Sequence, residues 1–211
     1  MKPYYSDKWT TIYLGDCREV LPELPKVDLV LTDPPYNVGK DYKSYNDRNP
    51  KYWQLMKGWF NEAKGISPLI VFTPGAVNLA GWMKHEKPFW IGCWYHSNAC
   101  SRTPIGGFLV WEPILIYGKP SKKVTKDAWN IPIAWQASVG KNHPVPKPER
   151  LFDELVLEFS NPDNLILDPF LGSGTTCYCA KKLLRKSIGI EINEAYCEIA
   201  AKRLSQSVME F

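Results

Sequence analysis

The sequence has few of the residues that build metal sites or disulfide frameworks. Its 211 residues include three histidines and six cysteines, and no two cysteines stand in a CxxC pair. We therefore expect no zinc site and no other metal centre. A secretory signal pattern is also missing from the N-terminus, so the cysteines are expected to be the reduced thiols of a cytoplasmic protein.

Long hydrophobic runs are missing as well. The longest stretch without a charged residue, 65–83, contains two prolines and three glycines, which argues against a membrane-spanning helix. It predicts instead a buried strand followed by a turn and a helix. With 45% hydrophobic and 23% charged residues, the chain has the composition of a globular protein, and its length predicts one domain with its own core.

The charge of the chain is modest but unevenly placed. The formal net charge is only +4 at pH 7, which alone does not indicate a nucleic-acid partner. Residues 118–150 hold seven basic against two acidic residues, and residues 38–64 hold six against three. Two solvated loops or two contacts to a polyanion would both explain this pattern.

The order of apolar runs and periodic segments predicts an α/β fold. Apolar runs bounded by turn residues predict strands at 11–14, 27–32, 69–73, 89–96, 108–117, 164–168 and 187–190. Helical spacing of large residues predicts helices at 52–64, 148–160, 175–186 and 195–208. Because strands alternate with helices, the sheet should be mostly parallel. The polar, basic segment 119–142 is the best candidate for an inserted loop or a small subdomain.

Residues 164–191 have the layout of a nucleotide-binding site. A strand leads to Asp168-Pro-Phe-Leu-Gly-Ser-Gly, a helix follows, and the next strand ends at Glu191. Glycines at such a turn let the backbone approach a ligand at the helix N-terminus. Glu191 lies 19 positions after Gly172, where a ribose-binding carboxylate is expected. A tight strand-to-helix turn without a ligand would show the same glycines, so this motif alone is weak.

The same segment lacks the features of two common phosphate-binding sites. Because no Gly-Lys-Ser or Gly-Lys-Thr is present, a P-loop is excluded. The third glycine of the dinucleotide fingerprint is replaced by Cys177, and Asp168 would repel a pyrophosphate. These absences favour a cofactor with a ribose and a positive charge but no phosphate, and S-adenosylmethionine is such a molecule.

A second motif, Asp33-Pro34-Pro35-Tyr36, ends the buried strand at 27–32, where ligands of open α/β sheets bind. The two prolines hold the loop in one extended shape. The Asp33 carboxylate and the Pro34 carbonyl thereby become neighbouring acceptors beside the Tyr36 ring. This set suits a planar ring with an exocyclic amino group, whereas a rigid turn with a solvated Asp33 is the alternative for the tetrapeptide alone.

Together, the two motifs closely resemble those of the DNA amino-methyltransferases, which modify adenine or cytosine. The matching blocks are Leu31-Thr-Asp-Pro-Pro-Tyr-Asn and Leu167-Asp-Pro-Phe-Leu-Gly-Ser-Gly-Thr-Thr. Their order is similar to the permuted β-type arrangement of that family, and blocks at 14–17, 143–150 and 188–193 agree with it. The resemblance implies a single-domain, Rossmann-like S-adenosylmethionine-dependent methyltransferase fold over residues 1–211, with helices on both faces of the sheet.

The resemblance also implies the roles of the catalytic tetrapeptide. Asp33 and Pro34 would accept hydrogen bonds from the target amine, and Pro35 would help to hold the loop. Tyr36 would stack on a base that is flipped out of the duplex. The amine would then attack the methyl group in line, with the enzyme mostly positioning and stabilising the reacting atoms.

A cofactor-binding set is implied in the same way. Glu191 would hold the ribose hydroxyls, Asp16 and Cys17 would lie near the adenine, and Lys147 would help to close the site. The complete expected set is Asp16, Cys17, Lys147, Asp168, Phe170, Gly172, Ser173, Gly174, Thr175, Glu191 and Asn193.

Double-stranded DNA is the implied partner of the two basic stretches. Residues 38–64, with Lys40 and Lys43, would follow the DNA backbone beside the catalytic loop. Residues 119–142 would be the target-recognition segment, with phosphate contacts from Lys122, Lys123 and Lys126. This segment is short for the family, so a short recognition site, a preference for single strands and a second subunit that lends surface all stay open.

The target base is expected to be adenine. Asp-Pro-Pro-Tyr is typical of adenine-specific members of the family, and transfer to N4 of cytosine is the alternative. An RNA or protein amide methyltransferase and a catalytically inert DNA-binding protein are weaker alternatives. No Pro-Cys dipeptide is present, which argues against a carbon-5 cytosine methyltransferase. A homodimer, an accompanying restriction enzyme and a bacterial or phage host stay open.

Overall fold

The structure is a computed structural model that describes residues 1–39, 41–42, 45–46, 48–133 and 147–206. Two expected DNA contacts, Lys40 and Lys43, lie outside the described residues, as do residues 134–142 of the expected target-recognition segment. In the described chain, strands and helices follow one another from β2 to α6, with runs of consecutive strands at β3-β4-β5 and β7-β8-β9, and this confirms the α/β fold.

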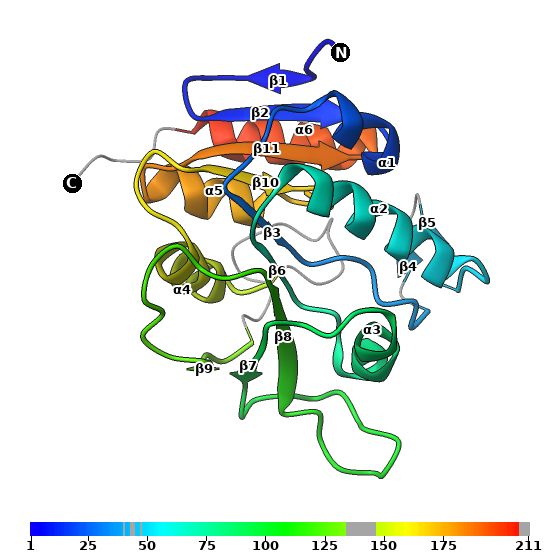
Figure 1. Cartoon of the computed structure of the whole chain (residues 1–211). Helices are drawn as coiled ribbons and strands as arrows, with labels where there is room; N and C mark the ends of the chain where they lie inside the picture. The colour runs from blue at the N-terminus through cyan, green and yellow to red at the C-terminus, as the bar shows by residue number, and fades with distance from the viewer. Residues whose placement is uncertain (40, 43–44, 47, 134–146, 207–211) are drawn as a thin grey trace.

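Most described strands belong to one sheet of nine strands, in the order β1-β2-β11-β10-β3-β6-β8-β7-β9 (Figure 1). The strands are β1 (Tyr5–Ser6), β2 (Thr10–Leu14), β3 (Leu29–Thr32), β6 (Ile70–Phe72), β7 (Trp90–Tyr95), β8 (Trp111–Tyr117), β9 (Ala128–Asn130), β10 (Leu165–Asp168) and β11 (Lys186–Glu191). Strands β2, β11, β10, β3 and β6 are parallel to one another. Antiparallel pairs occur only between β1 and β2, β6 and β8, and β7 and β8 among the described strands of this sheet, so it is mostly parallel, as predicted.

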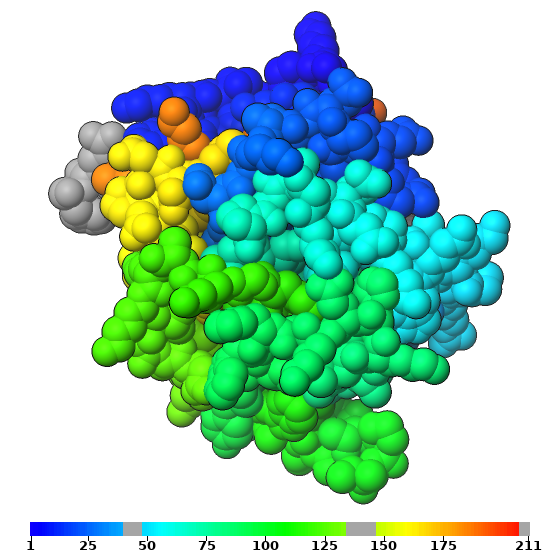
Figure 2. All heavy atoms as spheres, viewed as in Figure 1, coloured from blue at the N-terminus to red at the C-terminus, as the bar shows by residue number. Residues whose placement is uncertain are grey.

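Helices cover both faces of the sheet. One face carries α1 (Cys17–Val20), α2 (Tyr52–Ile66) and α3 (Leu79–His85), and the other carries α4 (Glu149–Phe159), α5 (Thr175–Lys182) and α6 (Glu194–Ser205). In Figure 2 the side chains of α2 and α3, coloured cyan to green, close over the sheet. All four residues of β3 are buried, because both of its faces are covered.

Aromatic packing holds the first helical layer against the sheet. Trp59 and Phe60 of α2 and Trp82 of α3 are completely buried and meet Phe72 of β6 edge to face, with ring centroids 4.8 to 6.2 Å apart. Pairs of this geometry add stabilisation beyond the area that they bury. The large residues that recur at helical spacing in 52–64 therefore lie on the side of α2 that faces the core. This confirms the helix that the sequence predicts there.

The boundaries of two predicted elements are wrong. Helix α5 ends at Lys182 and not at residue 186, because Leu184 adopts a left-handed conformation with φ 64° that a helix cannot continue through. Strand β8 begins at Trp111 and not at residue 108, since the chain before it forms a separate hairpin in which Leu109 N–H bonds to Ser101 O at 2.9 Å.

Some short elements carry no periodic pattern and are missing from the prediction. They are β1, β9, the hairpin of β4 (Asp41–Tyr42) and β5 (Tyr45–Asn46), α1, and two 3-10 turns at Leu21–Glu23 and Ala76–Asn78. Strand β9 falls within 119–142 and pairs with β7, and its Trp129 is 1% exposed. The described part of this segment is therefore built into the sheet and the core.

Within the described part of the chain, no helix has the length and apolar character needed to cross a membrane.

Candidate functional site

The two sequence motifs meet at the middle of the sheet. Strands β3 and β10 are adjacent and parallel, so Asp33, which follows β3, and Asp168, which ends β10, lie at the same edge. The helix after β3 covers one face and the helix after β10 covers the other, which makes this the switch point where open α/β sheets bind ligands. The Thr32 hydroxyl donates a hydrogen bond of 2.6 Å to Asp168 Oδ1 and joins the two strands.

The glycine-rich loop is tied to the end of β11. Both carboxylate oxygens of Glu191 accept backbone N–H groups, Oε2 from Gly172 at 2.8 Å and Oε1 from Asn193 at 2.9 Å. Gly174 has φ 82°, a conformation strained for any other residue, and a Cβ there would lie a tight 3.1 Å from Ala200 Cβ of α6. These contacts fix the loop where α5 begins.

A pocket lies between this loop, α1, α2 and the end of β3. The residues of the expected cofactor set that line it are Asp16, Cys17, Lys147, Asp168, Phe170, Gly172, Ser173, Thr175 and Glu191. Asp33 and Pro35 of the catalytic motif line it too. Gly174 and Asn193 do not, because Gly174 packs on α6 and the Asn193 side chain caps that helix at Ala195 N.

The charged groups of the pocket suit a cationic ligand. Asp16, Asp33, Asp168 and Glu191 line it, against Arg18 and Lys147. Burial raises the pKa of Asp168 to about 6 and also raises the pKa of Glu191. A cation placed beside these carboxylates would offset the cost of their burial. The hydrogen bonds and charge of Arg18 instead lower the pKa of Asp16.

One wall of the pocket is apolar. Leu55, Met56 and Trp59 of α2 contribute it, and the Trp59 ring meets Phe170 of the loop edge to face at 5.3 Å. Cys17 lies at the same wall, and burial raises the pKa of its thiol to about 12, so the thiol stays protonated at neutral pH. A ligand here would have an apolar slot as well as charged contacts.

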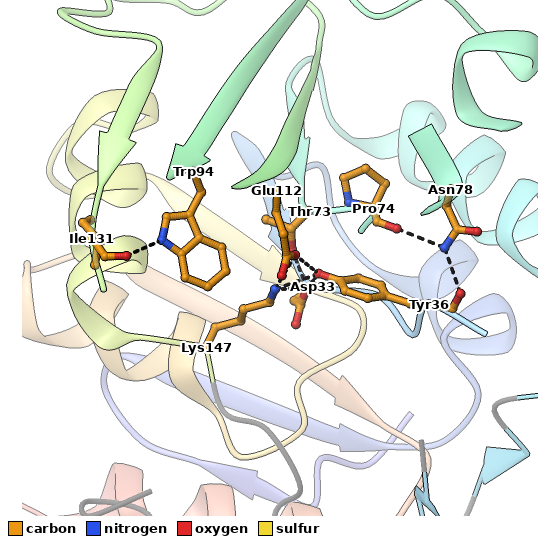
Figure 3. Close-up of polar contacts among 9 residues, drawn as sticks. All are labelled: Asp33, Tyr36, Thr73, Pro74, Asn78, Trp94, Glu112, Ile131 and Lys147. Atoms are coloured by element: carbon orange, nitrogen blue, oxygen red, sulfur yellow. Dashed lines mark hydrogen bonds and ion pairs between the residues drawn. The ribbon is translucent and has the colours of Figure 1, made fainter. Parts of the chain in front are cut away.

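The tetrapeptide Asp33-Pro-Pro-Tyr36 is held by a part-buried polar network (Figure 3). The Tyr36 hydroxyl lies 2.6 Å from Asp33 Oδ1 and 2.9 Å from Glu112 Oε2, so it donates its single proton to one carboxylate at a time. Lys147 Nζ donates to Tyr36 at 2.7 Å and to Glu112 at 2.8 Å. The Thr73 hydroxyl also donates to Asp33 Oδ1.

This network leaves two acceptors in the tetrapeptide available. Among the described residues, neither Asp33 Oδ2 nor the Pro34 carbonyl has a hydrogen-bond partner, whereas Asp33 Oδ1 has three donors nearby. The two acceptors belong to neighbouring residues at the carboxyl edge of β3. Both oxygens are therefore open to a donor from outside the described protein, as the expected role of the pair requires.

The Tyr36 ring is placed by the turn after β6. Asn78 Nδ2 donates to Tyr36 O at 2.8 Å and to Pro74 O at 3.1 Å. Gly75 has φ 71°, and a Cβ there would lie 2.7 Å from Tyr36 Cδ2, so only glycine lets the ring sit so close. Burial and the two carboxylates hold the pKa of Tyr36 above its usual value, so the hydroxyl keeps its proton.

Several residues of the site are missing from the sequence prediction. Glu112, Thr73 and Asn78 complete the network, and the α2 residues form the pocket wall. The sequence contains one indication of the importance of Glu112, because it is the one charged residue in the predicted strand 108–117. A carboxylate in an otherwise apolar strand needs a buried partner.

The expected DNA contacts of the segment 119–142 are not brought to the pocket. Lys122 Nζ donates to Leu157 O at 2.7 Å, and Lys126 forms an ion pair with Glu154, both on α4. Strand β9 runs parallel to β7, so these lysines lie toward the edge where the strands begin, opposite Asp33. This placement argues against phosphate contacts from Lys122 and Lys126 while a base lies at Asp33. Lys123 is exposed on the same segment.

Comparison with known proteins identifies the family. The family model described as DNA methylase, for N6 and N4 methyltransferases, matches residues 27–104 and 84–202. The type II methyltransferase M.HpaI of Haemophilus parainfluenzae is 30% identical over 88% of this chain and 70% of its own length. DNA adenine methyltransferase YhdJ of Escherichia coli K12 is 26% identical over 95% and 84%. Among solved structures, the cytosine-N4-specific PvuII DNA methyltransferase matches with a TM-score of 0.74 and 20% identity, over 99% of this chain and 91% of that one.

The matched residues contain both motifs that meet at the switch point. The structural match shows the fold, and the family model together with the relative at 30% identity shows the descent. The pocket with its buried carboxylates and the free acceptors of Asp33 and Pro34 fit this assignment. The chain thus belongs to the DNA methylase family and is an S-adenosylmethionine-dependent methyltransferase of amino groups in DNA.

Proposed function

We propose that this protein transfers a methyl group to N6 of adenine in double-stranded DNA. The observation that carries the proposal is the pair of acceptors on Asp33 and Pro34, which lies beside a pocket suited to a cationic cofactor. The Asp-Pro-Pro-Tyr sequence and the relative named a DNA adenine methyltransferase favour adenine over cytosine.

The two acceptors would activate a poor nucleophile. The lone pair of an aromatic amine is delocalised into its ring, and hydrogen bonds from both amine hydrogens favour a pyramidal nitrogen with a localised lone pair. S-adenosylmethionine, when bound, supplies an electrophilic methyl group. Asp33 would also stabilise the positive charge that develops on the amine, because its carboxylate is already oriented by the network. The amine, methylated at the expense of the cofactor's S–CH3 bond, would then give its acidic proton to the Asp33 carboxylate or to water.

Cofactor roles follow the lining of the pocket. Glu191 would accept the ribose hydroxyls with the lone pairs that its two backbone donors leave free. Asp16 and Cys17, at the other side, would lie near the adenine, and Asp168 would stabilise the positive charge. Phe170, Gly172, Ser173 and Thr175 would surround the methionine end.

The target base must leave the duplex to reach Asp33, so we infer base flipping with stacking on Tyr36. Stacking of this kind is worth roughly 1–3 kcal/mol per base. The basic stretch 38–64 would follow the DNA backbone, because it leaves the sheet at the same edge as Asp33. Residues 119–142 remain our proposed target-recognition segment, and we assign that role to the residues of the segment that follow β9.

Further assignments rest on the family. A cytoplasmic location in a bacterium or a phage-infected bacterium would place the enzyme with its DNA. The type II name of M.HpaI supports an accompanying restriction enzyme, and a homodimer would supply recognition surface that the short segment 119–142 lacks.

A transfer assay tests the target base. Purified protein, labelled S-adenosylmethionine and mixed-sequence duplex DNA are incubated, and digested nucleosides are resolved by mass spectrometry. We expect N6-methyladenine. N4-methylcytosine would contradict the adenine assignment while keeping the amine mechanism, and no labelled nucleoside despite tight cofactor binding would contradict DNA as the substrate.

A further inference from the structure

The charges around the Tyr36 hydroxyl are not matched one to one. One cation, Lys147, faces two carboxylates, Glu112 and Asp33. Its Nζ atom lies 2.8 Å from Glu112 Oε2 but 3.5 Å from Asp33 Oδ1. The side chains of Lys147 and Glu112 are only 9% and 13% exposed, so water screens this difference little.

The Lys147 ammonium is held on the Glu112 side by more than charge. Its Nζ atom lies 4.8 Å from the Trp94 ring centre and 5.1 Å from the Tyr36 ring centre, in the range of cation–π contacts. Trp94 is itself fixed, because its Nε1–H donates to Ile131 O at 2.7 Å (Figure 3). Trp94 and Glu112 are directly opposite one another on β7 and β8. The pairing of these two strands therefore places both side chains beside the Lys147 ammonium.

Glu112 has no direct route to the reacting atoms. It lies on β8, which is separated from β3 by β6, and it is absent from the pocket lining. Its contacts are to Lys147 and to the Tyr36 hydroxyl. We therefore expect an effect of Glu112 on methyl transfer to pass through these two groups. His96 is a further titratable neighbour that interacts with the Glu112 charge.

Without the Glu112 charge, Asp33 would be the remaining carboxylate near Lys147 among the described residues. The ammonium would then close on Asp33, since a charge-assisted hydrogen bond is shorter and stronger than a 3.5 Å ion pair. A tightly paired Asp33 carboxylate is a weaker acceptor for an amine and a weaker stabiliser of the charge that develops on it.

We propose that Glu112 is a positioning residue that draws the Lys147 ammonium away from Asp33, so that the Asp33 carboxylate stays available to the target amine. The inference rests on the proposed role of Asp33 and holds for adenine and cytosine alike. It assigns Lys147 to the catalytic network as well as to the wall of the cofactor pocket.

Two variants separate this role from a simple structural one. E112Q keeps the size of the side chain and removes its charge, and E112Q/K147M removes the cation as well. We expect E112Q to lower kcat for DNA methylation about 10- to 100-fold while the Kd for S-adenosylmethionine changes less than about threefold. We expect the double variant to recover at least about tenfold in kcat over E112Q, because Asp33 is released.

The control is E154Q, which removes one partner of a surface ion pair with Lys126 and should keep the wild-type rate. A double variant no faster than E112Q, or an unchanged rate in E112Q, would overturn the proposal. If E112Q lacks a cooperative thermal transition, E112M and E112M/K147M, which also remove the charge, are compared, with the same expected sign and the same overturning result. Wild-type transfer to cytosine would overturn only the adenine assignment, whereas no wild-type transfer to DNA would overturn both.

Discussion

Thr32 and Asp168 lie 136 positions apart in the sequence and share a hydrogen bond of 2.6 Å between Oγ1 and Oδ1. The bond joins the last residue of β3, which leads to Asp33, to the last residue of β10, which leads to the glycine-rich loop. It also gives the buried Asp168 carboxylate one of its donors, the Phe170 N–H at 3.0 Å being another. Burial still dominates, and the pKa of Asp168 is raised to about 6.

Replacing Asp168 by asparagine should therefore stabilise the cofactor-free protein, but only at higher pH. With a folded-state pKa above the unfolded value, the stability contributed by Asp168 is fully present below about pH 4 and is lost as the pH rises through about 6. At about 1.4 kcal/mol per pKa unit, D168N should raise the free energy of unfolding by up to about 3 kcal/mol at pH 8. Urea unfolding at pH 8 and pH 4.5 measures this, and equal differences at both values would contradict it.

The same carboxylate should make cofactor binding pH-dependent. A cationic ligand favours the ionised form of Asp168, so binding releases a proton near pH 6 and the Kd for S-adenosylmethionine should tighten between pH 5 and pH 7. Isothermal titration in buffers of different ionisation enthalpy detects the proton release. In D168N the Kd should be weaker and this pH dependence should disappear, and its persistence would assign it to another group.

Asp33 should matter for transfer and not for cofactor binding. D33A removes the free oxygen, which faces no donor in the described protein, together with the Oδ1 contacts to Tyr36 and Thr73. We expect kcat to fall at least about 100-fold, as for other groups that stabilise developing charge. The Kd for S-adenosylmethionine, measured by titration calorimetry, should change less than about threefold. Parallel losses in both quantities would contradict this division between the two motifs.

Gly75 offers a test of the Tyr36 ring position. G75A combines a positive φ with a Cβ placed 2.7 Å from the ring, so it should shift Tyr36 and lower the methylation rate about tenfold or more. The matched control is G65A in α2, where an added Cβ meets nothing within 4 Å and should raise stability by about 0.5–1 kcal/mol. Rate and melting temperature are measured for both variants, and equal rates would show that the ring is free to adjust.

Lys122 and Lys126 should contribute little to DNA affinity, because their ammonium groups are bonded to α4 at the edge away from Asp33. A phosphate contact typically contributes about one unit to the slope of log K against log salt. The K122A/K126A variant should therefore keep the wild-type slope in fluorescence anisotropy titrations. If the magnitude of the slope falls by about two, both lysines contact phosphates and this prediction is wrong.

Much of this architecture could be predicted because its signals are local. Asp33 and Asp168 each end a short apolar strand, and the glycines after Asp168 mark the turn into a helix. Parallel strands bring their carboxyl ends to one edge, so the meeting of the two motifs follows from the strand–helix alternation. The end of α5 was missed because the left-handed conformation of Leu184 has no signature in a non-glycine residue.

The supporting contacts of the site are non-local and could not be predicted in the same way. Glu112 reaches Lys147 and Tyr36 only because β8 folds back antiparallel beside β6, a topology that no periodic pattern encodes. Trp129 could equally have been a base contact, and the pairing of β9 with β7 places it in the core. Sequence patterns therefore predict individual helices and strands better than they predict which distant strands pair with one another.

The position of β2 in the sheet has a consequence for synthesis on the ribosome. Apart from β1, its partner in the described sheet is β11, whose residues emerge more than 170 positions later. The hairpin of β1 and β2 therefore lacks its sheet partner, and its apolar side chains stay exposed, until β11 has been synthesised. Contacts of such long sequence separation slow folding. The half of the sheet that bears Glu191 therefore closes late, so a nascent chain cannot form the complete cofactor pocket before the residues of β11 have left the ribosome.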